Sequence, residues 1–99
     1  MIKTYLLKEH VWLYPGKVGW YFITIPKKTT EEIDYFFSHV KRGWGSLPVK
    51  VTTGKTSWQT SIFPDKKTGT YFLPLKAVVR TKEKVSEKDL VIFSIEIED

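Results

Sequence analysis

The sequence contains no cysteine and only two histidines, His10 and His39. The missing cysteine excludes disulfide bonds, thiolate metal clusters and a cysteine nucleophile, and two imidazoles offer little for a metal site. The hydroxyls of Thr60 and Ser61 have no companion base in the sequence, and no constellation of acid, base and nucleophile is recognisable. We therefore expect a protein that is not an enzyme and that uses neither a metal ion nor a cofactor.

Long apolar runs are also missing. No stretch approaches the roughly 18 apolar residues of a transmembrane helix. Lys3, Lys8 and Glu9 interrupt the segment where a signal peptide needs an apolar core. These absences predict a cytoplasmic protein without membrane contact. The net charge of +5 permits an anionic partner without requiring one.

Aromatic residues, in contrast, are abundant: four tryptophans, five tyrosines and six phenylalanines among 99 residues. They stand with β-branched residues in short runs separated by Gly and Pro, which is typical of an all-β domain with tight turns. A chain of this length builds one core, so residues 1–99 are expected to form a single domain. Strands are predicted at about residues 2–13, 19–25, 47–52, 56–63, 69–75 and 90–97. In the last of them a period of two predicts one buried set of side chains, which consists of Val91, Phe93, Ile95 and Ile97.

One helix is predicted between the second and third strands. Thr29 and Glu32 have the spacing of a capping box, and four apolar residues follow at helical spacing. Gly43 would end this helix, because glycine readily adopts the left-handed conformation of a helix C-terminus. A second, shorter helix is expected at about residues 76–81.

Two predicted hairpins resemble each other in sequence. Residues 13–23 and 62–73 both contain a strand that ends near an aromatic residue, a turn with Pro and Gly, and a strand with a Tyr-Phe pair. In each half a helix and a further strand follow. The predicted architecture is therefore a six-stranded β-barrel with an internal pseudo-two-fold repeat, whose halves are about residues 1–53 and 54–99. The alternative is a chance similarity of two hairpins.

Four segments carry a resemblance to a known family. They are residues 19–22 (GWYF), 45–51 (GSLPVKV), 58–64 (WQTSIFP) and 73–80 (LPLKAVVR). On these segments the chain resembles a family of small β-barrel domains of unknown function, numbered nineteen-hundred-and-five among such domains. That family is often fused to a domain associated with bacteriocin protection, whereas the barrel is expected to act alone here.

The sequence departs from this family's pattern at one turn. The family usually has Gly-Asp where this sequence has Lys88-Asp89. Glycine adopts tight-turn conformations more easily than lysine does. The departure therefore predicts a less tight turn before the last strand.

The second half is also similar to the AbrB/MazE-like swapped-hairpin regulators and antitoxins. The similarity lies in residues 69–75 and in Glu87-Lys88-Asp89. In those proteins two chains interleave to form a double-split β-barrel that binds DNA. The resemblance implies a double-split barrel whose halves are supplied by one chain, and it makes nucleic acid the first partner to consider. Both a monomer and a homodimer agree with it.

Basic pairs recur at the ends of the predicted elements. Lys27 and Lys28 follow a strand, and Lys41 and Arg42 stand at the predicted end of the helix. Further basic residues are Lys66 and Lys67 in the second predicted hairpin, and Lys82 and Lys84 near the short helix. Such pairs can neutralise phosphates. Trp44 is expected to be exposed because flexible glycines flank it, and it can offer a stacking face to an unpaired base. The alternative is that solvated lysines keep the surface soluble. The scarcity of arginine, which phosphate-reading sites prefer, favours that alternative.

A second cationic pair is predicted on the short helix. If residues 76–80 are helical, Lys76 and Arg80 lie on one face and form a small anion-binding platform. In the alternative, Arg80 pairs with Glu87 or Asp89 and fixes the helix onto the barrel. The sequence thus predicts a non-enzymatic module that binds nucleic acid or, alternatively, binds a small anionic ligand or partner protein around Trp44, Lys76 and Arg80.

Most of the remaining aromatic residues have two interpretations. As core and barrel-mouth packing they would stabilise the fold. As walls of an open barrel mouth they would form a ligand pocket with Lys76 and Arg80 at its rim. The residues concerned are Trp12, Trp20, Tyr21, Phe22, Trp58, Tyr71 and Phe72.

Overall fold

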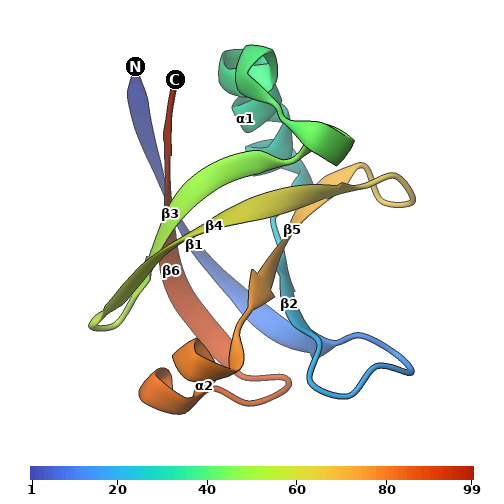
Figure 1. Ribbon diagram of the computed structural model, residues 1–99, viewed down its shortest axis with the longest axis vertical. Coiled ribbons are helices and arrows are strands. Elements are labelled where there is room, and N and C mark those ends of the chain that lie inside the picture. Colours follow the sequence, from blue (N-terminus) through green and yellow to red (C-terminus); the bar gives the residue numbers. More distant parts are fainter.

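The computed structural model describes residues 1–99 as a closed barrel of six antiparallel strands. The strands follow one another around the barrel in the order β1, β2, β5, β4, β3, β6 (Figure 1). They are β1 (Ile2–Leu13), β2 (Tyr21–Thr24), β3 (Leu47–Thr53), β4 (Thr56–Asp65), β5 (Thr70–Leu75) and β6 (Leu90–Glu98). The prediction of a mainly β fold with six strands is confirmed.

Aliphatic side chains fill the barrel. In β6 the inward-facing residues Val91, Phe93, Ile95 and Ile97 are buried, as the period-two alternation predicts. The other strands contribute similar rows of Val, Ile and Leu. Only three aromatic side chains belong to the buried core, Phe37, Tyr71 and Phe93. Most aromatic residues must therefore lie outside it.

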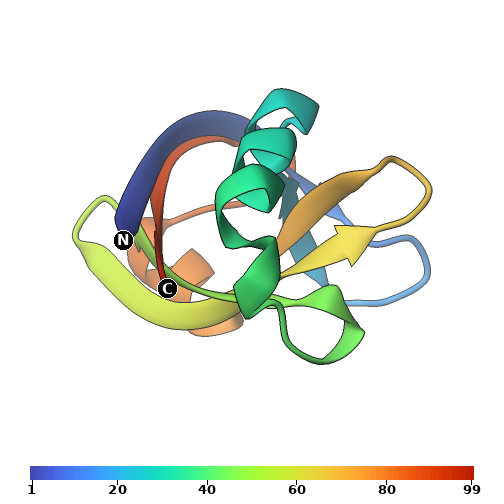
Figure 2. The ribbon, with the colours of Figure 1, turned by 90° about the horizontal axis from the view of Figure 1, so that it is seen from above.

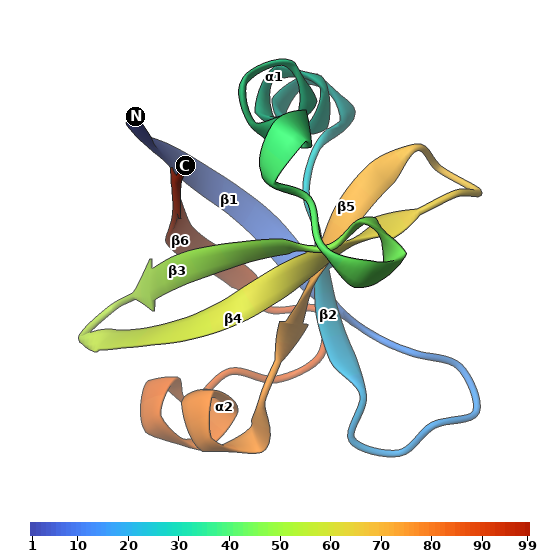
Figure 3. The ribbon, with the colours of Figure 1, turned by 45° about the horizontal axis from the view of Figure 1, so that its top comes forward.

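Two helices lie at opposite ends of the barrel (Figures 1 and 3). Helix α1 (Lys27–Phe37) buries Thr30, Ile33 and Phe37, and α2 (Ala77–Glu83) buries Val79. The Thr30 hydroxyl donates to the carbonyl of Ile25 at 3.3 Å and accepts the N–H of Tyr71 at 3.1 Å, which joins α1 to the strands. Neither helix is long and apolar enough to cross a bilayer.

Both predicted boundaries of α1 are wrong. The helix begins after Pro26, whose fixed φ of −55° suits the position before the first helical turn, and no side chain caps it. Thr29 therefore lies inside the helix rather than at a capping box. At the other end α1 gives way to a 3₁₀ turn, η1 (Ser38–Val40), and extended Lys41 leaves the helical path before Gly43.

Tyr71 connects the last turns of α1 to the barrel. Its hydroxyl donates to Asp34 Oδ1 at 2.5 Å, and Lys41 Nζ lies 3.2 Å from the same oxygen. Burial, reinforced by the bond to the Asp34 carboxylate, raises the pKa of Tyr71 well above its ordinary value. The phenol therefore stays a hydrogen-bond donor at neutral pH and holds α1 against β5.

The turn before β6 is tight, contrary to the expectation for Lys88-Asp89. The Lys88 N–H donates to the carbonyl of Val11 at 2.8 Å, and the Asp89 carboxylate accepts the N–H of Ser86 at 2.8 Å. These bonds hold Lys88 at φ 73°, in the left-handed region that favours glycine. The lysine therefore adopts the glycine conformation at a cost in backbone strain.

Lys88→Gly is expected to raise the free energy of unfolding by about 0.5–1 kcal/mol, because the strain is relieved while the turn's hydrogen bonds remain. Urea unfolding followed by circular dichroism measures the change. Lys82→Gly, inside α2, is the matched control and should lose about 1 kcal/mol through poorer helix propensity. Equal losses in the two variants would contradict the strain at Lys88.

Candidate aromatic binding groove

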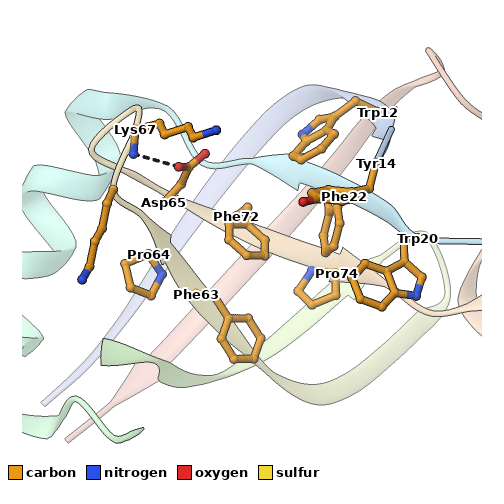
Figure 4. A pocket seen from close by; sticks show the side chains of 11 residues that line it. Trp12, Tyr14, Trp20, Phe22, Phe63, Pro64, Asp65, Lys67, Phe72 and Pro74 are labelled. Carbon is orange, nitrogen blue, oxygen red and sulfur yellow. Dashed lines mark hydrogen bonds between the residues drawn. The ribbon is translucent and has the colours of Figure 1, made fainter. Parts of the chain in front are cut away.

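A groove lined by aromatic side chains lies on the outer face of β1, β2, β5 and β4 (Figure 4). Trp12, Phe22, Phe72 and Phe63 form its floor, one from each strand. Each of them is next in sequence to a buried aliphatic or tyrosine side chain. Because successive side chains point to opposite faces of a sheet, the buried rows direct these rings outward.

Strand pairing brings the floor residues together. Trp12 stands directly opposite Phe22, and Phe63 directly opposite Phe72. The ring centroids of Trp12 and Phe22 are 5.0 Å apart, as are those of Phe22 and Phe72, and Phe63 stacks on Phe72 at 5.8 Å. The Trp12 Nε1–H donates to Thr24 Oγ1 at 2.9 Å and fixes that indole. The floor is thus held in place before any ligand arrives.

Two hairpins project on the same side of the barrel and border the groove (Figure 2). The β1–β2 hairpin contributes Tyr14 and Trp20, the latter 51% exposed. The β4–β5 hairpin contributes Lys66 and Lys67, neither of which forms an ion pair. Figure 4 shows Lys67 at one end of the groove and Trp20 at the other. The groove is open to solvent along one side and has a volume of about 810 Å³, within the range of pockets for drug-sized ligands.

A strained tryptophan lies near the same groove. Trp44 is 94% exposed and has a φ of 63°, in the short turn η2 (Gly43–Gly45). This turn packs against the groove residue Pro64, since a Cβ on Gly45 would lie 3.2 Å from Pro64 Cγ. A bulky residue that combines a strained backbone with an exposed side chain is typical of a functional site. The predicted exposure of Trp44 is confirmed.

Lys27 and Lys28 occupy the first turn of α1. A Cβ on Gly69 would lie 2.6 Å from Lys27 Nζ, so this ammonium group contacts the β4–β5 hairpin. It therefore adds positive charge close to Lys66 and Lys67. Lys28 is exposed and forms no ion pair.

Lys41 and Arg42 have different surroundings although they are adjacent. Lys41 is engaged by Asp34 and lies 5.6 Å from the centre of the Tyr71 ring, so it belongs to the contacts that hold α1. Arg42 is exposed, and its backbone N–H donates to the carbonyl of Ser46 at 2.8 Å. This bond closes the base of the turn that presents Trp44.

Arg80 fixes α2 onto the barrel, but not through a carboxylate. Its Nε–H donates to the carbonyl of Leu75 at 3.2 Å, and the guanidinium lies 3.8 Å from the centre of the Tyr21 ring. The alternative in which Arg80 pairs with Glu87 or Asp89 is wrong, because the carbonyl of Leu75, at the end of β5, accepts the Nε–H and no carboxylate pairs with the guanidinium.

Lys76 lies apart from these contacts. It precedes α2 in an extended conformation and is exposed. It lines a small hollow of about 280 Å³ that shares Trp20 and Pro74 with the aromatic groove. Lys76 is therefore the free cation of the predicted platform, while Arg80 is occupied by the fold.

The groove was only partly predictable from the sequence. Phe63, Pro64 and Pro74 were not predicted as site residues. Trp12, Trp20, Phe22 and Phe72 lie on the outer face and not at the barrel mouth, because aliphatic residues fill the interior. Their outward orientation could have been predicted from the alternation along each strand, because these rings alternate with the buried residues of the core.

Comparison with known families identifies a match over most of the chain. Residues 9–95 match the family described as Domain of unknown function (DUF1905). The matched range includes the whole groove, from Trp12 to Pro74, and also Trp44. No curated protein matches the sequence. Since the match spans most of the 99 residues, the chain belongs to the DUF1905 family.

Proposed function

We propose that this barrel is a non-enzymatic module that binds single-stranded nucleic acid in the aromatic groove. One observation carries the proposal: four adjacent strands turn aromatic rings outward, between two hairpins that bear lysines. Every base has a π face that stacks on such rings, and lysines neutralise the phosphates that connect the bases. A duplex conceals its base faces, so the groove favours a single strand.

Charge around the groove supports a polyanionic ligand. Asp65 is the only acidic residue among those that line it, and its Oδ1 accepts the backbone N–H of Lys67 at 3.0 Å. Lys17 adds a third ammonium group, 5.5 Å from the centre of the Trp20 ring. Cations beside exposed rings are the arrangement that single-strand binding proteins use.

The groove is a better candidate than the region around Lys76 and Arg80. The Arg80 guanidinium already donates to backbone carbonyls and stacks on Tyr21. A small anion at that place would depend chiefly on the exposed Lys76. The aromatic groove, in contrast, combines free ammonium groups with a preorganised apolar floor.

We also infer that the two halves of the chain are related by a pseudo-two-fold axis, as in a double-split barrel. The order strand, strand, helix, strand occurs twice along the chain. Exchanging β1 with β4, β2 with β5 and β3 with β6 leaves every neighbour relation around the barrel unchanged. This symmetry supports the proposed kinship with the swapped-hairpin DNA-binding proteins, and such a kinship would in turn favour a nucleic-acid partner.

Fluorescence anisotropy of labelled oligonucleotides tests the proposal. Single strands are expected to bind at micromolar concentration in about 50 mM salt and, with about three phosphate contacts, roughly tenfold or more weakly in about 200 mM salt. Duplexes of the same sequence should bind more weakly. Lys66→Ala with Lys67→Ala should flatten the salt dependence.

Lys55→Ala is the matched control for these lysine variants. Lys55 lies in the β3–β4 turn, at the opposite side of the barrel from the β4–β5 hairpin (Figure 1). The Lys55→Ala variant should bind single strands with the same affinity and salt dependence as the unmodified protein. Absence of single-strand binding at the lower salt concentration, or an equal effect of Lys55→Ala, would refute the proposal. So would preferential binding of a proline-rich peptide, another ligand class that aromatic grooves take.

A further inference from the structure

The first half of β1 has a strand on only one of its two edges. Residues 2–10 pair with β6, whereas β1 pairs with β2 only from Val11 to Leu13. Along the other edge of residues 3–7 lies a groove of about 470 Å³, with Thr29 and Glu32 of α1 on its far side. The barrel therefore leaves an unpaired strand edge beside α1.

The ladder shows which backbone groups face that edge. The Val11 N–H donates to the carbonyl of Asp89, toward the β6 side, and the Tyr14 N–H donates toward β2. Odd-numbered residues of β1 thus bond on the β6 side and even-numbered residues on the other side. In a regular antiparallel strand the bonding direction alternates with each residue. Between Lys3 and Glu9, the N–H and C=O groups that face the free edge belong to Thr4, Leu6 and Lys8.

This edge has neither a bulge nor a proline, and its protection consists of the charged side chains of Lys3 and Lys8 and of α1 across the groove. The register with β6 runs without a bulge from Ile2 to His10, and Leu6 is 75% exposed. The hydroxyl of Tyr5, a residue that lines the groove, is buried without a hydrogen-bond partner. Proteins normally shield a free edge with bulges, prolines or covering segments. An extended segment is the structure that satisfies such alternating backbone groups.

We propose that this edge pairs with the same edge of a second copy, in an antiparallel ladder across a two-fold axis. A register with Leu6 opposite the partner's Leu6 places Thr4 opposite the partner's Lys8. Both of these pairs consist of residues with free backbone groups, so the ladder uses all of them. The two exposed leucines then cover each other.

Charge complementarity selects this register and a second copy. It sets Lys3 opposite the partner's Glu9, and by symmetry Glu9 opposite the partner's Lys3. The Lys3 ammonium lies 4.0 Å from Glu32 Oε1 and 3.9 Å from the centre of the Phe36 ring, and the dimer requires it to exchange these contacts with α1 for the partner's Glu9. A shift by two residues in either direction would place Lys3 opposite the partner's Leu7, or Glu9 opposite the partner's Tyr5, and both ion pairs would be lost. An interface across a two-fold axis must be self-complementary, and residues 3–9 of β1 fulfil this condition.

Sedimentation velocity tests the proposal, with the unmodified protein expected to form a dimer near 100 µM, as weak interfaces do. Thr4→Pro removes an N–H that the single barrel does not use, so it should stay folded and become monomeric. Tyr5→Pro is the matched control, since it removes an N–H that bonds to β6 and should lower the unfolding temperature sharply. Circular dichroism separates the two effects.

Charge reversal provides a second and independent measurement. Lys3→Glu places like charges opposite each other twice and should weaken the dimer about tenfold. Because it also removes the contacts of Lys3 with Glu32 and Phe36, circular dichroism must show that the barrel stays folded. Adding Glu9→Lys to the same chain restores both ion pairs and should restore the dimer. A monomer at every concentration, a dimer that survives Thr4→Pro, or a monomer that instead takes up an extended peptide at this edge would overturn the proposal.

Discussion

Removing the two exposed indoles, by Trp20→Ala together with Trp44→Gly, is expected to weaken single-strand binding by about a hundredfold. Each stack of a base on an aromatic ring contributes about 1–3 kcal/mol. Trp20 stands at one end of the groove, and the turn of Trp44 packs on Pro64 in its lining. Fluorescence anisotropy with the same labelled oligonucleotide at about 50 mM salt measures the loss.

Trp44→Gly alone separates binding from stability. We expect it to lower affinity by about tenfold while raising the free energy of unfolding by about 0.5–1 kcal/mol. The gain arises because glycine adopts a φ of 63° without strain and because the exposed indole contributes no packing. Tyr35→Ala, an exposed aromatic residue of α1, is the control and should change neither quantity. Unaltered affinity in the Trp44 variant would contradict a role for this ring.

Phe37→Ala is expected to lower the free energy of unfolding by about 3–4 kcal/mol, the usual cost of removing a buried phenylalanine. Phe37 and Ile33 are the large apolar side chains that α1 buries, and both are fully enclosed. For a domain of this size the loss corresponds to a fall in melting temperature of roughly 15–25 °C. Thermal unfolding followed by circular dichroism measures it.

The neighbours of Phe37 provide a graded control on the same helix. Phe36 is half-buried and Tyr35 is exposed. Alanine at Phe36 should therefore lower the free energy of unfolding by less than alanine at Phe37 does, and alanine at Tyr35 should change it by at most about 0.5 kcal/mol. Three equal losses would contradict the inward orientation of Phe37. The chain leaves α1 through η1 toward Trp44, so Phe37→Ala should also loosen the turn that presents this ring.

Local signals in the sequence predicted local structure with uneven success. Alternation in residues 91–97 identified β6 and its buried face, and the flanking glycines of Trp44 predicted its exposure. The capping-box spacing of Thr29 and Glu32 was misleading, because Pro26 already fixes the chain for a helix that starts at Lys27. The capping pattern at Thr29 fails because Pro26, three residues earlier, already sets the backbone for the start of the helix.

The candidate site was harder to predict than the fold. Basic pairs are visible in any sequence, yet Lys41 is engaged by Asp34 and Arg80 by backbone carbonyls. Lys66 and Lys67, in contrast, border the groove without ion pairs. Whether a cation is free depends on which acceptors the fold brings close, and these acceptors lie far away in the sequence.

By itself the sequence determined the strands, the absence of cysteine chemistry and the family, because each depends on residue type and short-range spacing. Only the tertiary structure decided that Phe22 of β2 meets Phe72 of β5, and that residues 2–10 of β1 keep a free edge. Both follow from which strands become neighbours when the barrel closes. Barrel closure depends on the register of all six strands at once, which no local pattern specifies.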